Sequence, residues 1–374
     1  MKLTINPVLL ARLCLIVTLG LMSAFLTVEN AKAESMCGVD GQNNYILGFP
    51  TFQPYINKNL NMLPAAGSDK FLIQENAYTT MPPGGGDFRI ECKVSHMSND
   101  DPIVYPNQNG KAHHHTFFGN TSLAYNSDLM NLANVGNSTC RGGIVNRSAY
   151  WVPSMVDTAT GQPLMPDGGL WYYKSGLIGY FDPTTAGVRM PPNGLRMIAG
   201  NAKAKNDVEA SKHTAFSCRA PDGKFVVPNQ RTIPACPEGH TIIASVTFPQ
   251  CWDGLNLDWL DHISHMTYDY KYSFHTVDGK LRKKYTCPAS HPVPIVSLGL
   301  SIYYKVKTAD GTANWRLASD NYQKEGQNAG YSMHGDFVSG WNEEYAKKIE
   351  KNCLQQKVDC GSDKVGDGIR LMGR

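Results

Sequence analysis

Short runs of β-branched and aromatic residues recur along most of the chain, and Gly, Pro, Asn and Asp separate them. Runs of this length and composition are typical of β-strands. The clearest runs are DFRIECKVSHM (87–97), AYWVPSMV (149–156), GLWYYKSGLIGYF (169–181), GLRMIAGN (194–201), TIIASVTF (241–248), HMTYDYKYSFHTV (265–277) and PIVSLGLSIYYKV (294–306). An Asp-Gly pair between two extended runs, in HTVDGKLRKKY (275–285), also predicts a β-hairpin. The pattern therefore predicts a mainly β (α+β) protein with a large, loop-rich, β-sandwich-like domain.

One helix is predicted near the C-terminus, in NEEYAKKIEKNCLQQ (342–356). Asn342 is a suitable N-cap, and the two glutamates that follow it suit the positive end of a helix. Apolar residues recur every four positions and would form one stripe along this helix: Trp341, Tyr345, Ile349 and Cys353. We expect the helix to pack on the sheet as a structural element.

The first residues have the order of a secretory signal. Lys2 and Arg12 supply positive charge, LCLIVTLGLMSAFL (13–26) is apolar, and AKA ends at Ala33. A membrane anchor is the alternative, but the apolar run is short for a span and a small-residue cleavage site follows it. We therefore predict a signal peptide over 1–33, cleavage after Ala33, and a secreted or periplasmic protein with no membrane span in the mature chain.

The rest of the chain divides at the turn motif MPPGGGDF (81–88). Residues 34–80 are predicted to form an irregular N-terminal arm, and residues 81–374 a single β-rich domain, with two closely packed domains as the alternative. Charged residues make up only 18% of the chain, and the net charge is +3 with Lys and Arg scattered along it. This distribution argues against a basic nucleic-acid-binding face.

The cysteines predict disulfides. Ten are present, and Cys14 would be removed with the signal peptide. In an oxidising compartment the other nine should be largely paired, which predicts a disulfide-stabilised domain. They include no Cys-x-x-Cys pair, which argues against a zinc ribbon or a thioredoxin-like motif. The plausible local pairs are Cys218 with Cys236 and Cys353 with Cys360, and the odd total leaves one cysteine unpaired or paired between chains.

Three consecutive histidines stand in KAHHHTFFGN (111–120). On a strand, His113 and His115 point to one face and His114 to the other. Two imidazoles at alternate strand positions can converge on one metal ion. The alternative is a set of solvated histidines or histidines that are satisfied in the core.

Further histidines and aspartates gather in three later segments with loop-like sequence. They are Asp253, Asp258, Asp261, His262 and His265 in CWDGLNLDWLDHISHMTY (251–268), His291 in CPASHPVPIV (287–296), and His334 and Asp336 in GYSMHGDFVSGW (330–341). Loops on a rigid scaffold commonly carry binding groups. Three imidazoles, or two with a carboxylate, make a zinc or copper site, and the same groups could act as a metal-free acid/base pair. The alternative is that they hold long loops together through hydrogen bonds.

At these residues the chain resembles secreted fungal and bacterial proteins grouped as domain-of-unknown-function family nineteen ninety-six. The resemblance runs from about Phe88 to Cys353. It rests on Asp101-Pro102-Ile103-Val104 before the His-x-His of His113 and His115, on Cys140 followed by NRSAYWVPSM, and on GLRMIAGN, FPQCWDGLNLDWLDHISHM, CPASHPVPIVSLGL and MHGDFVSGW. His114 inside the pair, and Phe117 and Phe118 before Gly119, depart from the family pattern, so His114 has no family role.

The resemblance implies export and a shared pocket built from these blocks, and it implies no activity. Fungal members can carry carbohydrate-recognition modules, which makes a polysaccharide or cell-wall role an expectation by analogy. Missing motifs argue against other classes: the chain has no HExxH zinc-protease helix and no GxSxG nucleophile elbow. Cleavage after Ala33 would place Glu34 first, which excludes the copper oxygenases that bind metal through an N-terminal histidine.

Large aromatic side chains lie in or near the same blocks: Trp151, Trp171, Tyr172, Tyr173, Trp252 and Trp259. Exposed along one groove, they would form a platform for sugar rings, and the alternative is that most of them are core.

The sequence therefore predicts a metal-assisted hydrolase or lyase that acts on an extracellular glycan or cell-wall polymer. The predicted ligands for zinc or copper are His113, His115 and His291, with His265 as another third ligand. The predicted catalytic residues are His262, His265, Asp261, His334 and Asp336. The predicted substrate-binding residues are Trp151, Trp252, Asp253 and Arg196. Asp253 with Asp258 or Asp336 could form a catalytic carboxylate pair if the fold brings them within ~5–10 Å.

Two other functions stay open at this point. One is a non-enzymatic carbohydrate-binding or surface-interaction protein, in which the aromatic residues bind the ligand. The other is a secreted metal-binding protein.

Overall fold

The structure is a computed structural model that describes residues 37–39, 45–47, 67–176, 187–277, 279–320 and 328–373. The chain divides into two compact units, residues 1–51 and 52–374. In the first unit, β1 (Cys37–Val39) pairs antiparallel with β2 (Tyr45–Leu47). The predicted signal peptide, most of the predicted arm and the end of the predicted strand at 169–181 lie outside the described residues.

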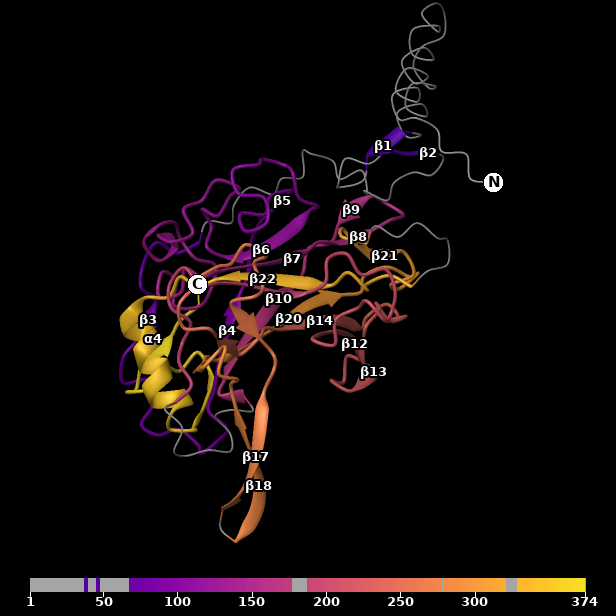
Figure 1. The fold of residues 1–374 in the computed structure, drawn as a ribbon. Coiled ribbons are helices and arrows are strands. Elements are labelled where there is room, and N and C mark those ends of the chain that lie inside the picture. The colour runs from indigo at the N-terminus through magenta and orange to yellow at the C-terminus, as the bar shows by residue number, and fades with distance from the viewer. Residues whose placement is uncertain are drawn as a thin grey trace, which may run out of the picture. The chain divides into compact units, whose positions relative to one another are not determined.

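The second unit is built on a seven-stranded sheet (Figure 1). Its strands, in spatial order, are β13 (Phe225–Gln230), β12 (Thr214–Arg219), β14 (Thr241–Thr247), β20 (Ser297–Lys305), β10 (Gly168–Lys174), β4 (Asp87–Cys92) and β23 (Asp359–Ser362). All neighbours pair antiparallel except β23 with β4, which are parallel. Buried and partly exposed residues alternate along β10 and β20, so one face of this sheet is core.

A five-stranded antiparallel sheet supplies the other layer of the core. Its strands, in spatial order, are β11 (Arg196–Gly200), β22 (His334–Val338), β7 (Ala149–Pro153), β6 (His115–Gly119) and β5 (Val94–Ser98). Phe118 and Tyr150 of this sheet contact Trp171 of the seven-stranded sheet edge to face, with ring centroids 5.0 and 5.3 Å apart. One hydrophobic cluster spans both sheets, so they pack face to face as a sandwich. The mainly β, sandwich-like prediction is confirmed.

The outer face of the five-stranded sheet is buried as well. A second hydrophobic cluster lies there, made of residues from the sheet and from the loops at 101–135: Ile103, Phe117, Leu123, Leu129, Leu132, Ala149, Trp151 and Val338. The loops include the short 3-10 helix η2 (Leu132–Asn134). They cover the face that would otherwise meet solvent, which explains why β6, β7 and β22 are buried along their whole length.

The second unit also contains four smaller sheets of two or three strands among the described residues. They are β16 (Met266–Thr267), β15 (Cys251–Trp252) and β19 (Val293–Pro294); β21 (Trp315–Leu317), β8 (Met155–Asp157) and β9 (Gln162–Pro163); β24 (Arg370–Leu371) and β3 (Ile73–Gln74); and the hairpin β17 (Lys271–Val277) and β18 (Lys280–Thr286). The hairpin predicted from Asp-Gly is confirmed by the β17–β18 pairing, with Asp278 itself outside the described residues.

The predicted C-terminal helix is confirmed as α4 (Glu343–Ile349), which continues as a π-helical turn, η3 (Glu350–Leu354). The Asn342 side chain caps it by accepting hydrogen bonds from the backbone N–H groups of Glu344 and Tyr345. Its apolar stripe, from Trp341 to Cys353, joins the main core. No helix in the described part of the chain is long and apolar enough to cross a membrane.

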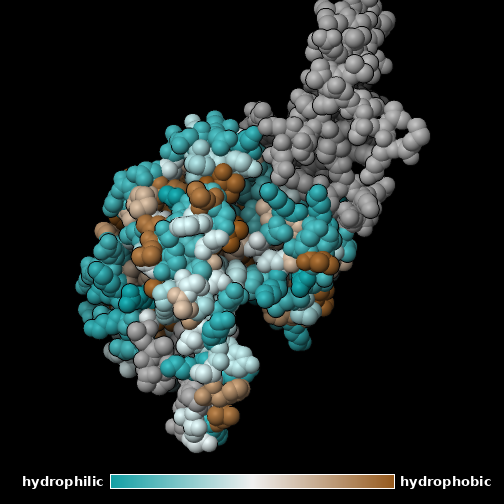
Figure 2. Space-filling model, in the orientation of Figure 1, coloured by the Kyte–Doolittle hydropathy of each residue, from teal (hydrophilic) through white to brown (hydrophobic). Residues whose placement is uncertain are grey.

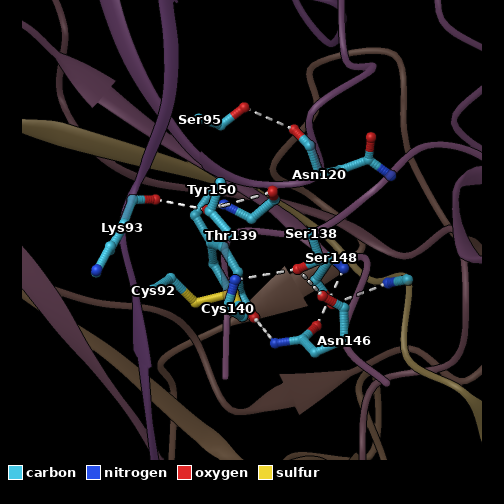
Figure 3. Close-up of a disulfide and its surroundings, with 12 residues drawn as sticks. Cys92, Lys93, Ser95, Asn120, Ser138, Thr139, Cys140, Asn146, Ser148 and Tyr150 are labelled. Carbon is cyan, nitrogen blue, oxygen red and sulfur yellow. Dashed lines mark hydrogen bonds between the residues drawn. A yellow bond between two sulfur atoms is a disulfide. The ribbon is translucent and has the colours of Figure 1, made fainter. Parts of the chain in front are cut away.

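Four disulfides staple the described second unit: Cys92–Cys140, Cys218–Cys236, Cys251–Cys287 and Cys353–Cys360. Both local pairs predicted from the sequence are confirmed. Figure 3 shows Cys92–Cys140, beside which Thr139 Oγ1 donates a hydrogen bond to the Lys93 carbonyl at 2.6 Å. The bond ties the end of β4 to the chain that leads into β7.

Candidate metal centre

The strand register brings two distant histidines to one place. His115 of β6 lies opposite Pro153 of β7, and Asp336 of β22 lies opposite Trp151 of the same strand. By that register His334, two residues before Asp336, also lies beside Pro153. Side chains alternate across a strand, so His115 and His334 share the outer face with only a small proline ring between them. Their ring centroids are 5.7 Å apart.

His113 completes a group of three imidazoles. It stands two residues before His115, and its ring lies 4.2 Å from that of His115 and 5.0 Å from that of His334. One nitrogen of each ring lies within 4.8 Å of the other two. His114 faces away, as the alternation predicts, and its Nδ1 lies 2.8 Å from Ser154 Oγ.

Two buried carboxylates adjoin these rings. Asp101, Asp336 and His115 form a second group whose candidate ligand atoms also lie within 4.8 Å of one another. Asp101 Oδ1 accepts hydrogen bonds from the amides of Ile103 and Val104, which fixes its position at the start of the covering loop. Asp336 Oδ2 lies 3.9 Å from His334 Nε2. We call Asp101, His113, His115, His334 and Asp336 the His/Asp cluster.

Burial keeps the imidazoles of this cluster neutral. It lowers the pKa of His115 to about 3 and that of His334 to about 4, and it holds the pKa of His113 well below the ordinary value. Burial also raises the pKa of Asp336 well above its ordinary value, and the nearby Asp101 charge adds to that effect. At neutral pH the three histidines are therefore in the form that binds metal ions.

Two histidines are oriented by the backbone. His115 Nδ1 lies 2.9 Å from the Asp100 carbonyl, and His334 Nδ1 lies 2.8 Å from the Ser332 carbonyl. A carbonyl only accepts, so both Nδ1 atoms carry the proton and each Nε2 presents a lone pair. Metal-binding histidines are commonly fixed in this way.

The atoms that face the middle of the cluster lack partners. The Nε2 atoms of His113 and His115 and Oδ2 of Asp336 are buried and form no hydrogen bond with any described residue. Buried polar atoms nearly always have a partner, so three such atoms in one place make this cluster a candidate binding site. His113 is only partly buried, whereas the other four residues are at most 4% exposed.

The loop at 253–265 lies beside this cluster but does not join it. His262 Nδ1 lies 2.9 Å from Asp258, and Asp258 forms an ion pair with Arg196 at 2.7 Å. His265 Nε2 donates to the Arg196 carbonyl at 2.7 Å. Burial raises the pKa of Asp101, and the hydrogen bonds from the amides of Val104 and Ile103 oppose that rise.

The other predicted residues of this region organise the loops. Asp253 accepts from the amides of Leu255 and Asn256, and Asp261 accepts from those of Ile263 and Ser264. Trp252 Nε1 donates to the Asn256 carbonyl. His291 Nε2 donates to the Ser264 carbonyl, so the structure does not bring this predicted ligand to the His/Asp cluster.

For Trp151 and Trp171 the structure agrees with the core location and not with an aromatic platform, so Trp151 is not available as the predicted substrate contact. Trp151 and Trp171 are fully buried, because each lies on a sheet face that is covered by another layer. Trp252 is half-buried, and Trp259 is 47% exposed. A substrate therefore cannot stack on Trp151, which instead packs against Phe117 beneath the covering loop.

Sequence reasoning did not propose Asp101 as a site residue. The signal was present, since Asp101 opens the Asp-Pro-Ile-Val block that precedes the histidines. An aspartate before proline also suits a turn. Asp101 has both roles here, because it accepts a hydrogen bond within the turn and its carboxylate lies near His115.

Comparison with known proteins gives one match. The model of the family described as Domain of unknown function (DUF1996) matches residues 101–341, a range that contains the whole His/Asp cluster. No curated protein and no solved structure matches the chain.

Proposed function

The chain belongs to the DUF1996 family, whose description assigns no activity, and we propose that its His/Asp cluster holds a divalent metal ion for hydrolysis or lyase chemistry on an extracellular polymer. His113, His115 and His334 are the proposed ligands. Asp101 and Asp336 are the proposed ligand or acid/base carboxylates.

One observation carries this proposal: three neutral imidazoles converge with one nitrogen of each within 4.8 Å of the others. Neutral imidazoles do not repel one another as imidazolium ions would, so the group can persist in the folded protein. The Nε2 atoms of His113 and His115 have no hydrogen-bond partner among the described residues, and their lone pairs would be used in coordinate bonds to a metal ion. The backbone carbonyls behind His115 and His334 supply the outer shell that such a site requires.

The donor set favours zinc, with copper second. Three histidines with a further position for water or a carboxylate is a common catalytic zinc arrangement, and copper also accepts imidazole. A bound ion of this kind would acidify water and polarise a substrate oxygen.

The carboxylates favour catalysis over metal storage. A storage site needs only ligands, whereas this cluster holds two buried carboxylates on the His115 side of the imidazoles. Burial raises the pKa of both Asp101 and Asp336, and the charge of Asp101 raises the pKa of Asp336 further. Two adjacent carboxyl groups with raised pKa values suit a general acid or base.

The loop at 253–265 is the proposed contact for a polymer. It flanks the cluster through Arg196 and His262, and it exposes four large apolar side chains: Leu255, Trp259, Leu260 and Ile263. Trp259 can stack on a sugar ring, so a glycan or cell-wall polymer is the proposed substrate class.

Metal content tests the proposal. The mature protein, purified without a tag from an oxidising compartment, is analysed by mass spectrometry beside a His113→Ala/His115→Ala variant. We expect near-stoichiometric zinc or copper in the wild type and none in the folded variant. His291→Ala is the matched control and should retain the metal, because His291 bonds to Ser264 outside the cluster.

A wild-type protein that is isolated metal-free and does not take up added zinc or copper overturns the proposal. Metal that is retained by the double variant would place the site elsewhere. Metal without turnover on any glycan would leave the metal-binding part standing and refute the enzymatic part.

A further inference from the structure

The hairpin of β17 and β18 stands apart from the sandwich. The two strands pair only with each other among the described strands, and Figure 1 shows them projecting from the body. An isolated two-stranded ribbon is marginally stable in water. Its base is fastened, because the disulfide Cys251–Cys287 joins β15 to the residue that follows β18.

One face of this hairpin is apolar and exposed. Tyr272, Phe274 and Thr276 lie opposite Tyr285, Lys283 and Leu281, so these six residues share a face. Tyr272, Phe274 and Leu281 are 56%, 58% and 69% exposed. Figure 2 shows hydrophobic side chains gathered on the projecting hairpin. Large apolar side chains grouped and exposed in this way mark a contact surface.

The same hairpin concentrates positive charge. Residues 271–286 contain Lys271, Lys280, Arg282, Lys283 and Lys284 against the single acid Asp278, whereas the whole chain has a net charge of only +3. Lys271 and Lys280 stand at positions that face away from the apolar side, by the register of the two strands. Lys283 lies on the apolar side with its ammonium 4.5 Å from the Tyr272 ring centroid.

We propose that the β17–β18 hairpin docks this protein on the surface of an anionic lipid bilayer. An element with aromatic and aliphatic side chains on one face and lysines on the other lies in the interface of such a bilayer, with its apolar face in the acyl boundary. The lysines then contact the anionic headgroups.

Two other occupants fit the hairpin less well. An acidic polysaccharide would match the charge, but Phe274 and Leu281 have no polar group for its hydroxyls. A second copy of the hairpin would bring like charges together. The apolar loop at 253–265 lacks the cations, since its charged side chains Asp253, Asp258 and Asp261 are acidic.

Vesicle co-sedimentation of the full mature chain tests the proposal. The probes are vesicles of phosphatidylcholine alone and vesicles of equal parts phosphatidylglycerol and phosphatidylcholine. We expect binding to the anionic vesicles only, weakened by added salt. Lys271→Gln/Lys280→Gln/Lys283→Gln should reduce the partition coefficient roughly 100-fold, since each cation near the surface contributes several-fold. Phe274→Ser/Leu281→Ser should reduce it by at least ~10-fold.

Matched control variants distinguish binding through the hairpin from non-specific binding through other exposed lysines or apolar side chains. Lys203→Gln/Lys205→Gln/Lys212→Gln removes the same charge from exposed lysines elsewhere, and Leu255→Ser/Leu260→Ser removes exposed apolar side chains from the loop. Both should bind like the wild type, and circular dichroism should show all four variants folded. Equal loss in the matched variants, or no vesicle binding, overturns the proposal. Retention on an acidic polysaccharide column without vesicle binding would reassign the hairpin to polysaccharide.

Discussion

Two buried polar clusters lie on opposite faces of the five-stranded sheet, and they are built in opposite ways. On the inner face, Asn146, Tyr150, Tyr173 and Trp341 form what we call the tyrosine cluster. Its side-chain donors and acceptors meet: the two tyrosine hydroxyls lie 2.5 Å apart, Asn146 donates to Tyr150, and Trp341 donates to Tyr173. On the outer face, the His/Asp cluster leaves three buried atoms without a partner among the described residues.

The difference is one of hydrogen-bond pairing, and it is the reason why the His/Asp cluster is the candidate site. Every residue of both clusters except the partly buried His113 is almost fully buried, so burial alone does not distinguish the clusters. A satisfied cluster rigidifies the core, and nothing is gained by adding a ligand to it. A cluster whose lone pairs converge without donors is costly unless something binds there. The pairing of the atoms, together with the convergence of three imidazoles, therefore makes the His/Asp cluster the candidate for a metal site.

The largest expected effect is on the stability of the metal-loaded protein. If the His/Asp cluster binds metal, the free energy of unfolding should rise by about 4 kcal/mol when free metal is about 1,000 times Kd. Chelation should lower the melting temperature of the wild type accordingly, as measured by calorimetry. The His113→Ala/His115→Ala variant should not respond to the chelator. An equal chelator effect in that variant would contradict the contrast between the two clusters.

In the metal-free protein, a lower pH is expected to have a smaller effect on the free energy of unfolding. Burial lowers the pKa of His334 from 6.5 to about 4. Between these two pH values the residue is protonated in the unfolded chain and neutral in the folded protein. The corresponding stability is fully present above about pH 6.5 and is lost as the pH falls toward about 4. At about pH 5 the loss for this residue is about 2 kcal/mol. His334→Gln should reduce the loss by that amount in urea unfolding, whereas Tyr173→Phe should keep the wild-type acid response.

The smallest effect concerns the tyrosine cluster itself. Tyr173→Phe leaves Trp341 Nε1 without its acceptor and removes one partner from the Tyr150 hydroxyl. We expect a loss of about 1.5 kcal/mol in the free energy of unfolding, with metal content unchanged. Asp336→Asn should cost the metal-free protein less, because Oδ2 has no hydrogen bond with a described residue to lose. A larger cost for Asp336→Asn would show that the His/Asp cluster is structural.

Much of the fold could be predicted from the sequence, because strand patterns are local. The runs at 87–97, 149–156, 241–248 and 294–306 contain observed strands, and the hairpin and the capped helix follow from turn and capping chemistry. The order of strands in the sheets could not be read, because β4 pairs with β10 and β23 through contacts between segments far apart in the chain. Buried and exposed residues alternate along a strand that has one solvent-facing side. This alternation is absent at β7, because loops bury its outer side.

The candidate site was predictable only in part. The His-x-His pair of His113 and His115 was visible as a local pattern, but its partners depend on register. His334 joins the pair because β22 and β6 both flank β7, and His291 does not because it ends a loop bound to Ser264. Trp151 was a poor candidate for substrate contact, since the sequence does not reveal that the loops at 101–135 cover it.

The disulfide Cys251–Cys287 has a practical consequence for handling the protein. It encloses both the exposed loop at 253–265 and the β17–β18 hairpin, the two described segments of this region that a protease reaches most easily. A cut anywhere between the two cysteines leaves the fragments covalently joined. Such a nicked protein would migrate as an intact chain on a non-reducing gel and separate into two fragments only after reduction, so purity should be judged on reducing gels.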